Sequence, residues 1–250
     1  MDAGTSARFE PYCGPAPTPG SLTAAWNLDP LLLAVLVGAT LAGALHLHRS
    51  RVGSVRQAAL GAASGVAVLA FVSPLCALTA ALFAARSLHH LVLIGVLAPA
   101  LAVAFPLRVR GGMAALVVLS AALWAWHVPA LYTAAWDSVA FYWLMQAALL
   151  VPAWAFWSAT LAPGRGFGAS MAAGMQAAAL AGQMGLIGAI LTFARRPLYP
   201  EHIALTEAFG IAPLVDQQLA GLIMWVPGML PLALVAAVML HGAWMCESRA

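Results

Sequence analysis

The sequence predicts an all-α polytopic membrane protein with seven transmembrane helices, its N-terminus outside and its C-terminus inside. Of its 250 residues, 63% are hydrophobic and only 8% are charged, whereas soluble domains carry about 25% charged residues. The apolar residues fall in runs of about 20, the length that a helix needs to cross a bilayer. These values exclude a soluble enzyme. The chain has no lysine, which also excludes a retinal protein or any chemistry that requires a lysine Schiff base.

The apolar runs are separated by arginine, proline, glycine or acidic residues, and they lie at 31–48, 57–72, 87–105, 112–131, 138–161, 170–194 and 216–245. We divide the chain into an outer tail, a single transmembrane bundle and a short cytoplasmic tail, at residues 1–30, 31–245 and 246–250. No apolar signal region precedes Leu31, so the first run is expected to stay as a span. The stretch from Ser73 to Ala85 begins with Ser-Pro and is too short to span. It is expected to form an interfacial or re-entrant loop, or to extend the second helix beyond a proline kink.

The arginines predict the orientation, because Lys and Arg concentrate in short cytoplasmic loops. With the N-terminus outside, seven arginines lie inside, namely Arg49, Arg51, Arg56, Arg108, Arg110, Arg165 and Arg249. Four lie outside, namely Arg8, Arg86, Arg195 and Arg196. This majority favours an outer N-terminus and an inner C-terminus. Topology thus explains the basic residues, and nucleic-acid binding is not predicted.

Polar residues that could bind a metal gather toward the outer face. His89 and His90 begin the third run and His127 closes the fourth, just before Pro129. Imidazole, thiol and thioether ligands suit Cu(I), whereas Mg²⁺ or Ca²⁺ would require clustered carboxylates. The candidate metal ligands are His90, His127, Met224, Cys13, Cys76 and Asp216. Asp216 has an alternative role as a helix N-cap, and the three cysteines of the chain are too few and too scattered to indicate a disulfide framework.

Helix geometry narrows these candidates. Adjacent His89 and His90 point about 100° apart, so only one of them is expected to face a shared site. On the seventh run Gln217 and Met224 are seven residues apart and share a face, and Gly221 between them leaves room for a partner or an ion. On the fifth run Tyr142 and Gln146 share a face.

A row of small residues on the sixth run, Gly174, Ala178 and Gly182, predicts close helix packing. Small residues let two backbones approach within a membrane, where lipid gives no hydrophobic drive for helix association. We expect this row to serve packing and no chemistry.

Three segments, residues 126–132 (WHVPALY), 188–200 (GAILTFARRPLYP) and 216–228 (DQQLAGLIMWVPG), resemble the CtaG-like family of cytochrome c oxidase assembly factors. The tail motif at 12–14 (YCG) and the approach at 26–30 (WNLDP) resemble its proteobacterial branch. The likeness implies a seven-helix protein of the bacterial inner membrane that is not an enzyme. Such a protein helps to assemble the copper centres of a haem-copper oxidase by binding or presenting copper, as Cu(I), on the periplasmic side. Its implied partners are oxidase subunits, the lipid bilayer and a periplasmic copper chaperone.

The family commonly has a His-x-x-x-His pair at the start of the third helix and another on the fifth. Here the first pair of positions holds Arg86 and His90, and the second holds Tyr142 and Gln146. Arg86 would also repel a cation. Either a reduced ligand set holds the ion, or this chain is a scaffold that has lost metal binding.

Three further classes compete with a copper-handling assembly factor. A non-metal accessory subunit of a respiratory complex would use its small-residue helix faces. The next class is a membrane enzyme or a haem-binding electron carrier. Haem would need two facing histidines, which His90 and His127 could supply. A transporter has little support, because the chain lacks paired intramembrane carboxylates and detectable inverted repeats.

Overall fold

The computed structural model describes residues 11–109, 111–162 and 166–247, with side chains described as far as Met245. Arg8, Arg110, Arg165 and Arg249, the first ten residues of the predicted outer tail and the last residues of the predicted cytoplasmic tail lie outside this part. The predicted fold class is confirmed. Over the described residues every regular element is helical, and six helices are long and apolar enough to cross a membrane, or seven if one bent pair counts as a single span.

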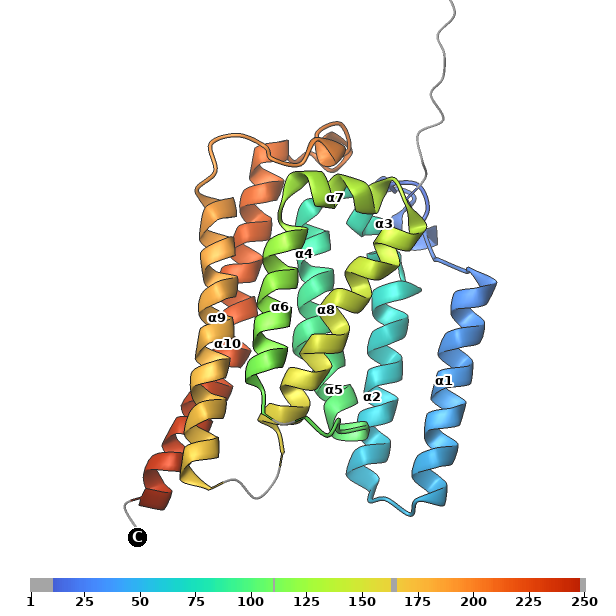
Figure 1. The fold of residues 1–250 in the computed structure, drawn as a ribbon. Helices are drawn as coiled ribbons and strands as arrows, with labels where there is room; N and C mark the ends of the chain where they lie inside the picture. The colour runs from blue at the N-terminus through green and yellow to red at the C-terminus, as the bar shows by residue number, and fades with distance from the viewer. Residues whose placement is uncertain (1–10, 110, 163–165, 248–250) are drawn as a thin grey trace, which may run out of the picture.

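The first two spans form an edge of the bundle. Helix α1 covers Pro30–Arg49 and α2 covers Ser54–Phe71, and Figure 1 shows them side by side. Asp29 begins α1 because its carboxylate accepts the backbone N–H groups of Leu31 and Leu32, and proline follows at the first helical position. Most side chains of α1 are exposed, which suits a helix that faces lipid.

The stretch from Ser73 to Ala85 is not an extension of α2. The short helix α3, Pro74–Ala81, begins where the Ser73 hydroxyl accepts the Leu75 N–H at 3.2 Å. It lies at one end of the bundle (Figure 1). The alternative of a proline-kinked second helix is therefore wrong, and the stretch forms a separate short helix that is followed directly by the third span.

The third span is continuous but changes its winding, with α4 at Phe83–Val92, a π-helical turn at Leu93–Leu97 and α5 at Ala98–Ala104. The π turn widens the helix and leaves backbone groups to be satisfied from outside. Here the Trp157 indole donates to the Ile94 carbonyl at 2.7 Å. At the far end the Arg56 guanidinium donates twice to the Ala104 carbonyl, at 2.9 and 2.7 Å, and so caps the span.

The fourth span is the bent pair. Helix α6, Met113–Trp126, and helix α7, Pro129–Trp136, meet at 81°. Pro129 has no N–H and favours an extended residue before it, so the helix ends at His127 as the sequence predicts. Helix α7 lies across one end of the bundle (Figure 1).

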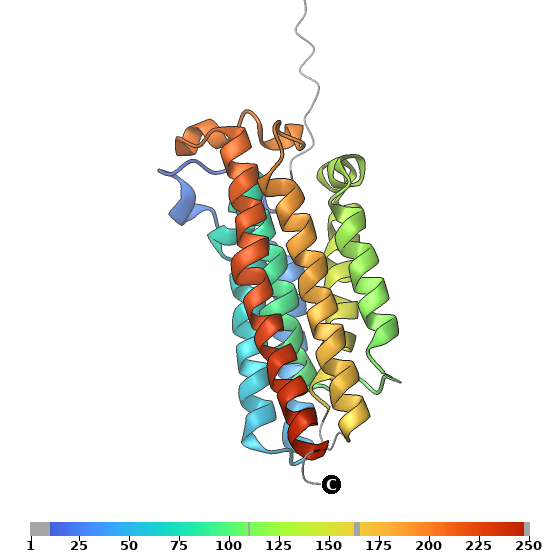
Figure 2. The same ribbon diagram turned by 90° about the vertical axis from the view of Figure 1, so that its left-hand side faces the viewer.

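Three long helices complete the bundle, α8 at Val139–Thr160, α9 at Phe167–Thr192 and α10 at Pro213–Glu247. Figure 2 shows α9 and α10 running alongside each other. Gly174 packs against Leu240, and Gly188 packs against the Gly221 backbone. The predicted packing role holds for Gly174 but is wrong for Gly182, which has open space around it. Gly221 leaves no room for an ion, because the α9 backbone fills that space.

One end of the bundle gathers the connections and is called the loop end below. It holds residues 11–29, α3, α7 and the α9–α10 connection with its short helices η3, Pro200–His202, and η4, Thr206–Phe209 (Figure 1). The described chain starts there and α10 finishes at the opposite end, as an odd number of spans requires. Which end faces the periplasm stays a prediction.

Candidate functional site at the loop end

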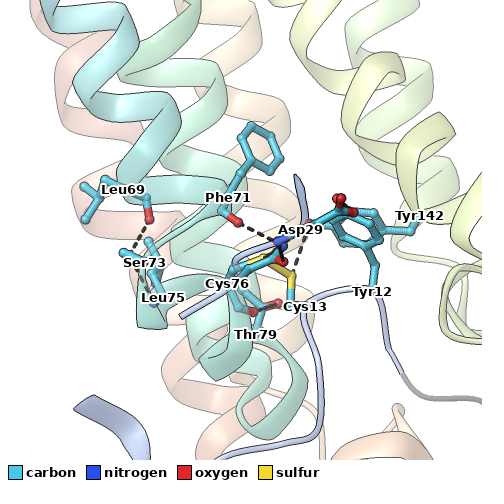
Figure 3. The surroundings of a disulfide bond; sticks show 11 residues. Tyr12, Cys13, Asp29, Leu69, Phe71, Ser73, Leu75, Cys76, Thr79 and Tyr142 are labelled. Carbon is cyan, nitrogen blue, oxygen red and sulfur yellow. Dashed lines mark hydrogen bonds between the residues drawn. A yellow bond between two sulfur atoms is a disulfide. The ribbon is translucent and has the colours of Figure 1, made fainter. Parts of the chain in front are cut away.

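The N-terminal segment is bonded covalently to the loop end. Cys13 and Cys76 form a disulfide with a Cα–Cα distance of 5.4 Å across a sequence separation of 63, and both side chains are buried (Figure 3). The expectation that the cysteines form no disulfide framework is wrong for this pair, because only the tertiary fold brings α3 beneath the tail. Their predicted role as copper ligands stays a prediction that requires the disulfide to be reduced first, since the thiolate is the form that binds metal.

Aromatic and polar contacts hold the same segment in place. Tyr12 stacks on Tyr142 with ring centroids 5.0 Å apart, and its hydroxyl donates to Asp29 at 2.8 Å. Burial and this hydrogen bond raise the pKa of the Tyr12 phenol, and the same bond lowers the pKa of the Asp29 carboxyl. The Cys13 sulfur lies 3.4 Å from the Tyr142 hydroxyl. Residues 12 and 13 therefore cover the place where α8 begins.

Beneath this cover lies Arg86, which is only 4% exposed. Its guanidinium carbon lies 5.9 Å from the Tyr132 ring centroid and 5.7 Å from that of Tyr142. Nε and Nη1 have no hydrogen-bond partner. Two aromatic faces attract the cation but leave these two N–H directions unsatisfied.

The next helical turn carries a second polar level. Helices α4 and α8 both run inward from the loop end (Figure 1), and His90 and Gln146 follow Arg86 and Tyr142 by four residues. A four-residue step returns to the same helix face, so His90 and Gln146 lie one turn deeper on the faces that hold Arg86 and Tyr142. His90 Nε2 and both amide atoms of Gln146 are buried without a partner. The predicted common face of Tyr142 and Gln146 agrees with the burial of both.

His89 points elsewhere, as the sequence predicts for adjacent helical residues. Its ring meets the Phe71 ring edge to face at 5.4 Å, on the side of α2. It is fully buried, and neither ring nitrogen has a hydrogen-bond partner. Of the two histidines, His89 is thus the one that packs against α2, and its ring centroid lies 5.9 Å from that of His90.

His127 uses one of its ring nitrogens in a backbone hydrogen bond. Its Nδ1 lies 2.6 Å from the Leu123 carbonyl, to which it donates, so Nε2 keeps its lone pair. A backbone acceptor on one ring nitrogen is the arrangement that orients metal-binding histidines. His127 lies within electrostatic range of His90, and Met224 is buried on α10, which packs against α4.

Asp216 caps a helix, but not its own. Its two carboxylate oxygens accept the backbone N–H groups of Phe83 at 2.7 Å and Ala84 at 3.2 Å. These are the first residues of α4, so Asp216 in α10 satisfies the N-terminus of a helix 133 residues earlier in the chain. The sequence thus correctly offered helix capping as an alternative role for Asp216. The helix that it caps is α4, however, and not the helix that contains it. A metal role for Asp216 stays a prediction, and it would compete with both bonds.

The two glutamines that follow Asp216 hold the α9–α10 connection. Gln217 accepts the Leu198 N–H at 2.6 Å and donates to the Arg196 carbonyl, and Gln218 donates to the Ala194 carbonyl. Gln217 shares a buried face with Met224 as predicted. Its amide is occupied by the loop, which makes it a structural residue.

Sequence reasoning missed a buried pair that joins the same connection to α7. The Tyr132 hydroxyl donates to His202 Nε2 at 2.6 Å, and His202 Nδ1 faces the Ala81 carbonyl at 3.3 Å. Burial, aided by the nearby Arg86 charge, lowers the pKa of His202 from 6.5 to about 3. The imidazole is therefore neutral at physiological pH. The sequence places His202 in a connection between two spans, and this position does not indicate that the side chain is buried.

The described residues contain no group of three or more His, Cys, Asp or Glu side chains placed to hold one metal ion. The six predicted ligands separate into distinct roles. The two cysteines are bonded to each other, Asp216 caps α4, His90 Nε2 has no partner, and His127 bonds the Leu123 carbonyl through Nδ1.

These features define a multi-pass α-helical membrane protein with a buried polar cluster beneath a covered loop end. Residues 110–245, more than half of the chain, match the sequence profile of the cytochrome c oxidase caa3 assembly factor family. The chain belongs to this family, which confirms the resemblance seen in the sequence. The segments at 126–132, 188–200 and 216–228 all lie within the match. No curated protein and no solved structure matches the chain, and its branch of the family stays a prediction.

Proposed function

We propose that this chain assists cytochrome c oxidase assembly by holding Cu(I) transiently at its loop end and passing it to a nascent oxidase subunit. The bundle would lie in the bacterial inner membrane with the loop end on the periplasmic side, where a periplasmic copper chaperone could supply the metal. Membership of the oxidase assembly family supports a role that is not enzymatic. The observation that carries the copper role is the oriented His127 within electrostatic range of His90, whose Nε2 is buried without a partner.

A sparse ligand set suits this role. Copper is cargo here, and a cargo ion must leave for the oxidase, so a complete cage would oppose transfer. Two imidazoles and the Met224 thioether are ligands that Cu(I) accepts. Met224 is 3% exposed and adapts readily to a changing neighbour, because its side chain is unbranched and polarizable.

A specific observation favours a second candidate, a scaffold that binds no metal. The Arg86 guanidinium is buried beside the proposed site, and the two cysteines are consumed by a disulfide. In this role the small-residue faces and the loop end would stabilise an oxidase subunit directly.

Copper analysis separates the two candidates. The detergent-purified protein is loaded anaerobically with Cu(I), desalted and analysed for copper, beside a His90→Ala/His127→Ala variant. A matched control, His46→Ala/His48→Ala, removes two exposed histidines near the end of α1, away from the loop end. Copper near one equivalent in wild type and control, and none in the first variant, supports copper handling.

The opposite result would support the scaffold. In that case no form of the protein retains copper, and the His90→Ala/His127→Ala variant restores oxidase assembly to a deletion strain as well as wild type does. An absorbance spectrum of the same samples checks the haem alternative, which requires a Soret band.

A further inference from the structure

We propose that Arg86 binds a small monovalent anion, a halide or a simple carboxylate, beside the Tyr132 and Tyr142 rings. This inference does not rest on the copper role. It starts from Arg86, whose guanidinium is 4% exposed and has two nitrogens without partners. A buried cation of this kind requires a counter-charge or a full set of acceptors.

The described carboxylates do not supply that counter-charge. Asp216 is directed at the N-terminus of α4, where both oxygens accept backbone N–H groups. Glu201 accepts a hydrogen bond from the Thr133 hydroxyl with Oε1, and its Oε2 is buried with no hydrogen-bond partner, Arg86 included. Neither forms an ion pair with Arg86, and within the described ranges no other acidic side chain does so. The nearby aromatic rings of Tyr132 and Tyr142 attract the cation, but its Nε and Nη1 still have no hydrogen-bond partner.

The surrounding polar atoms match an anion. The Gln146 amide has two N–H groups to donate, and it is 2% exposed with no partner. His90 Nε2 is unpartnered on the same face as Arg86, one turn deeper. One fixed positive charge with several N–H donors around it is the chemistry of an anion site.

The side chains around Arg86 limit the size of the anion that can reach it. The Cys13–Cys76 disulfide and Tyr12 cover the loop end above Tyr142 (Figure 3), and Tyr132 closes a second side of the guanidinium. Chloride and formate are therefore chosen as probes. Gluconate, a large hydroxylated carboxylate, serves as the anion that is too bulky to enter.

The test is a thermal-unfolding titration of the detergent-purified protein in sodium gluconate, with gluconate replaced by chloride or formate at constant ionic strength. We expect a saturable rise in the unfolding midpoint, because a ligand that binds only the folded state stabilises it. Arg86→Gln should lose this rise, with an apparent affinity at least tenfold weaker. Arg195→Gln removes the same charge from an exposed loop residue and should keep the rise.

A second variant covers the case in which Arg86→Gln fails to fold. Gln146→Leu keeps the guanidinium and removes a donor, and it should weaken the anion affinity without abolishing it. The line width of ³⁵Cl in nuclear magnetic resonance gives a direct readout of chloride binding for each variant. No saturable effect in wild type, or an equal effect in folded Arg86→Gln protein, would overturn the proposal and leave water as the partner of Arg86.

Discussion

Two sets of buried polar side chains lie near the same end of this bundle and differ in how their hydrogen bonds are used. Asp216, Gln217 and His202 bond to backbone groups in helix ends and connections. Arg86 and Gln146 keep buried polar atoms without partners. The first set is called the capping set below and the second, together with His90, the interior set.

The difference follows from what each side chain faces. Only the first and last turns of a helix have free backbone groups, so a polar side chain that faces the end of a neighbouring helix or a connection finds a partner there. Arg86 faces the aromatic rings of Tyr132 and Tyr142, and a polar side chain in such a place must meet another side chain, water or a ligand. Capping residues thus explain the architecture, and the interior set indicates where a ligand would bind.

The largest effect is expected from the bond that fastens the cover over the interior set. Cys13→Ser/Cys76→Ser should lower the free energy of unfolding by at most about 4 kcal/mol, because the bond closes a long loop in the unfolded chain. Its sequence separation is 63. Denaturant unfolding in detergent measures the change.

Cys246→Ser provides the control, since it removes a cysteine and leaves the disulfide intact. If the disulfide variant keeps wild-type stability, the tail is held by Tyr12 and its neighbours alone. In that case the disulfide would not be what holds the N-terminal segment over the interior set.

Within the capping set, Asp216→Leu should cost about 3 kcal/mol, because it leaves two buried backbone N–H groups of α4 unpaired, at about 1–3 kcal/mol for each. Asp216→Asn keeps one acceptor oxygen and should cost less. The same detergent unfolding assay measures both. If Asp216→Leu loses copper with unchanged stability, Asp216 belongs with the interior set as a ligand.

Much of the fold could be predicted from the sequence, because a helix that crosses a lipid bilayer requires a continuous apolar run, and such runs are visible in the sequence. The break before Pro129 and the divergence of His89 and His90 also follow from local geometry. The target of Asp216 and the partner of Cys13 could not be predicted, since each depends on which helix lies beside it. For the same reason the sequence singled out Arg86 only as a departure from the family and could not show that it is buried without a counter-charge.

The pH dependence of stability should identify His202 as a member of the capping set. Its pKa is about 3 in the folded protein against 6.5 ordinarily, so the unfolded chain binds the proton more readily between these values. Its contribution is complete above pH 6.5 and is lost as the pH falls, by about 2 kcal/mol at pH 5. His202→Phe should flatten this part of the pH profile by that amount. An unchanged slope would show that His202 becomes protonated without cost.

The smallest effect concerns the link between the anion and copper. In gluconate, Arg86→Gln should bind Cu(I) about tenfold more tightly than wild type, because a fixed positive charge one helical turn from His90 opposes a second cation. Competition with a Cu(I)-selective chelator measures the affinity, and Arg195→Gln should behave as wild type. In saturating formate the wild-type affinity should approach that of Arg86→Gln, since a bound anion neutralises the guanidinium. A gap that persists in formate would mean that the anion and the copper occupy the cluster in turn.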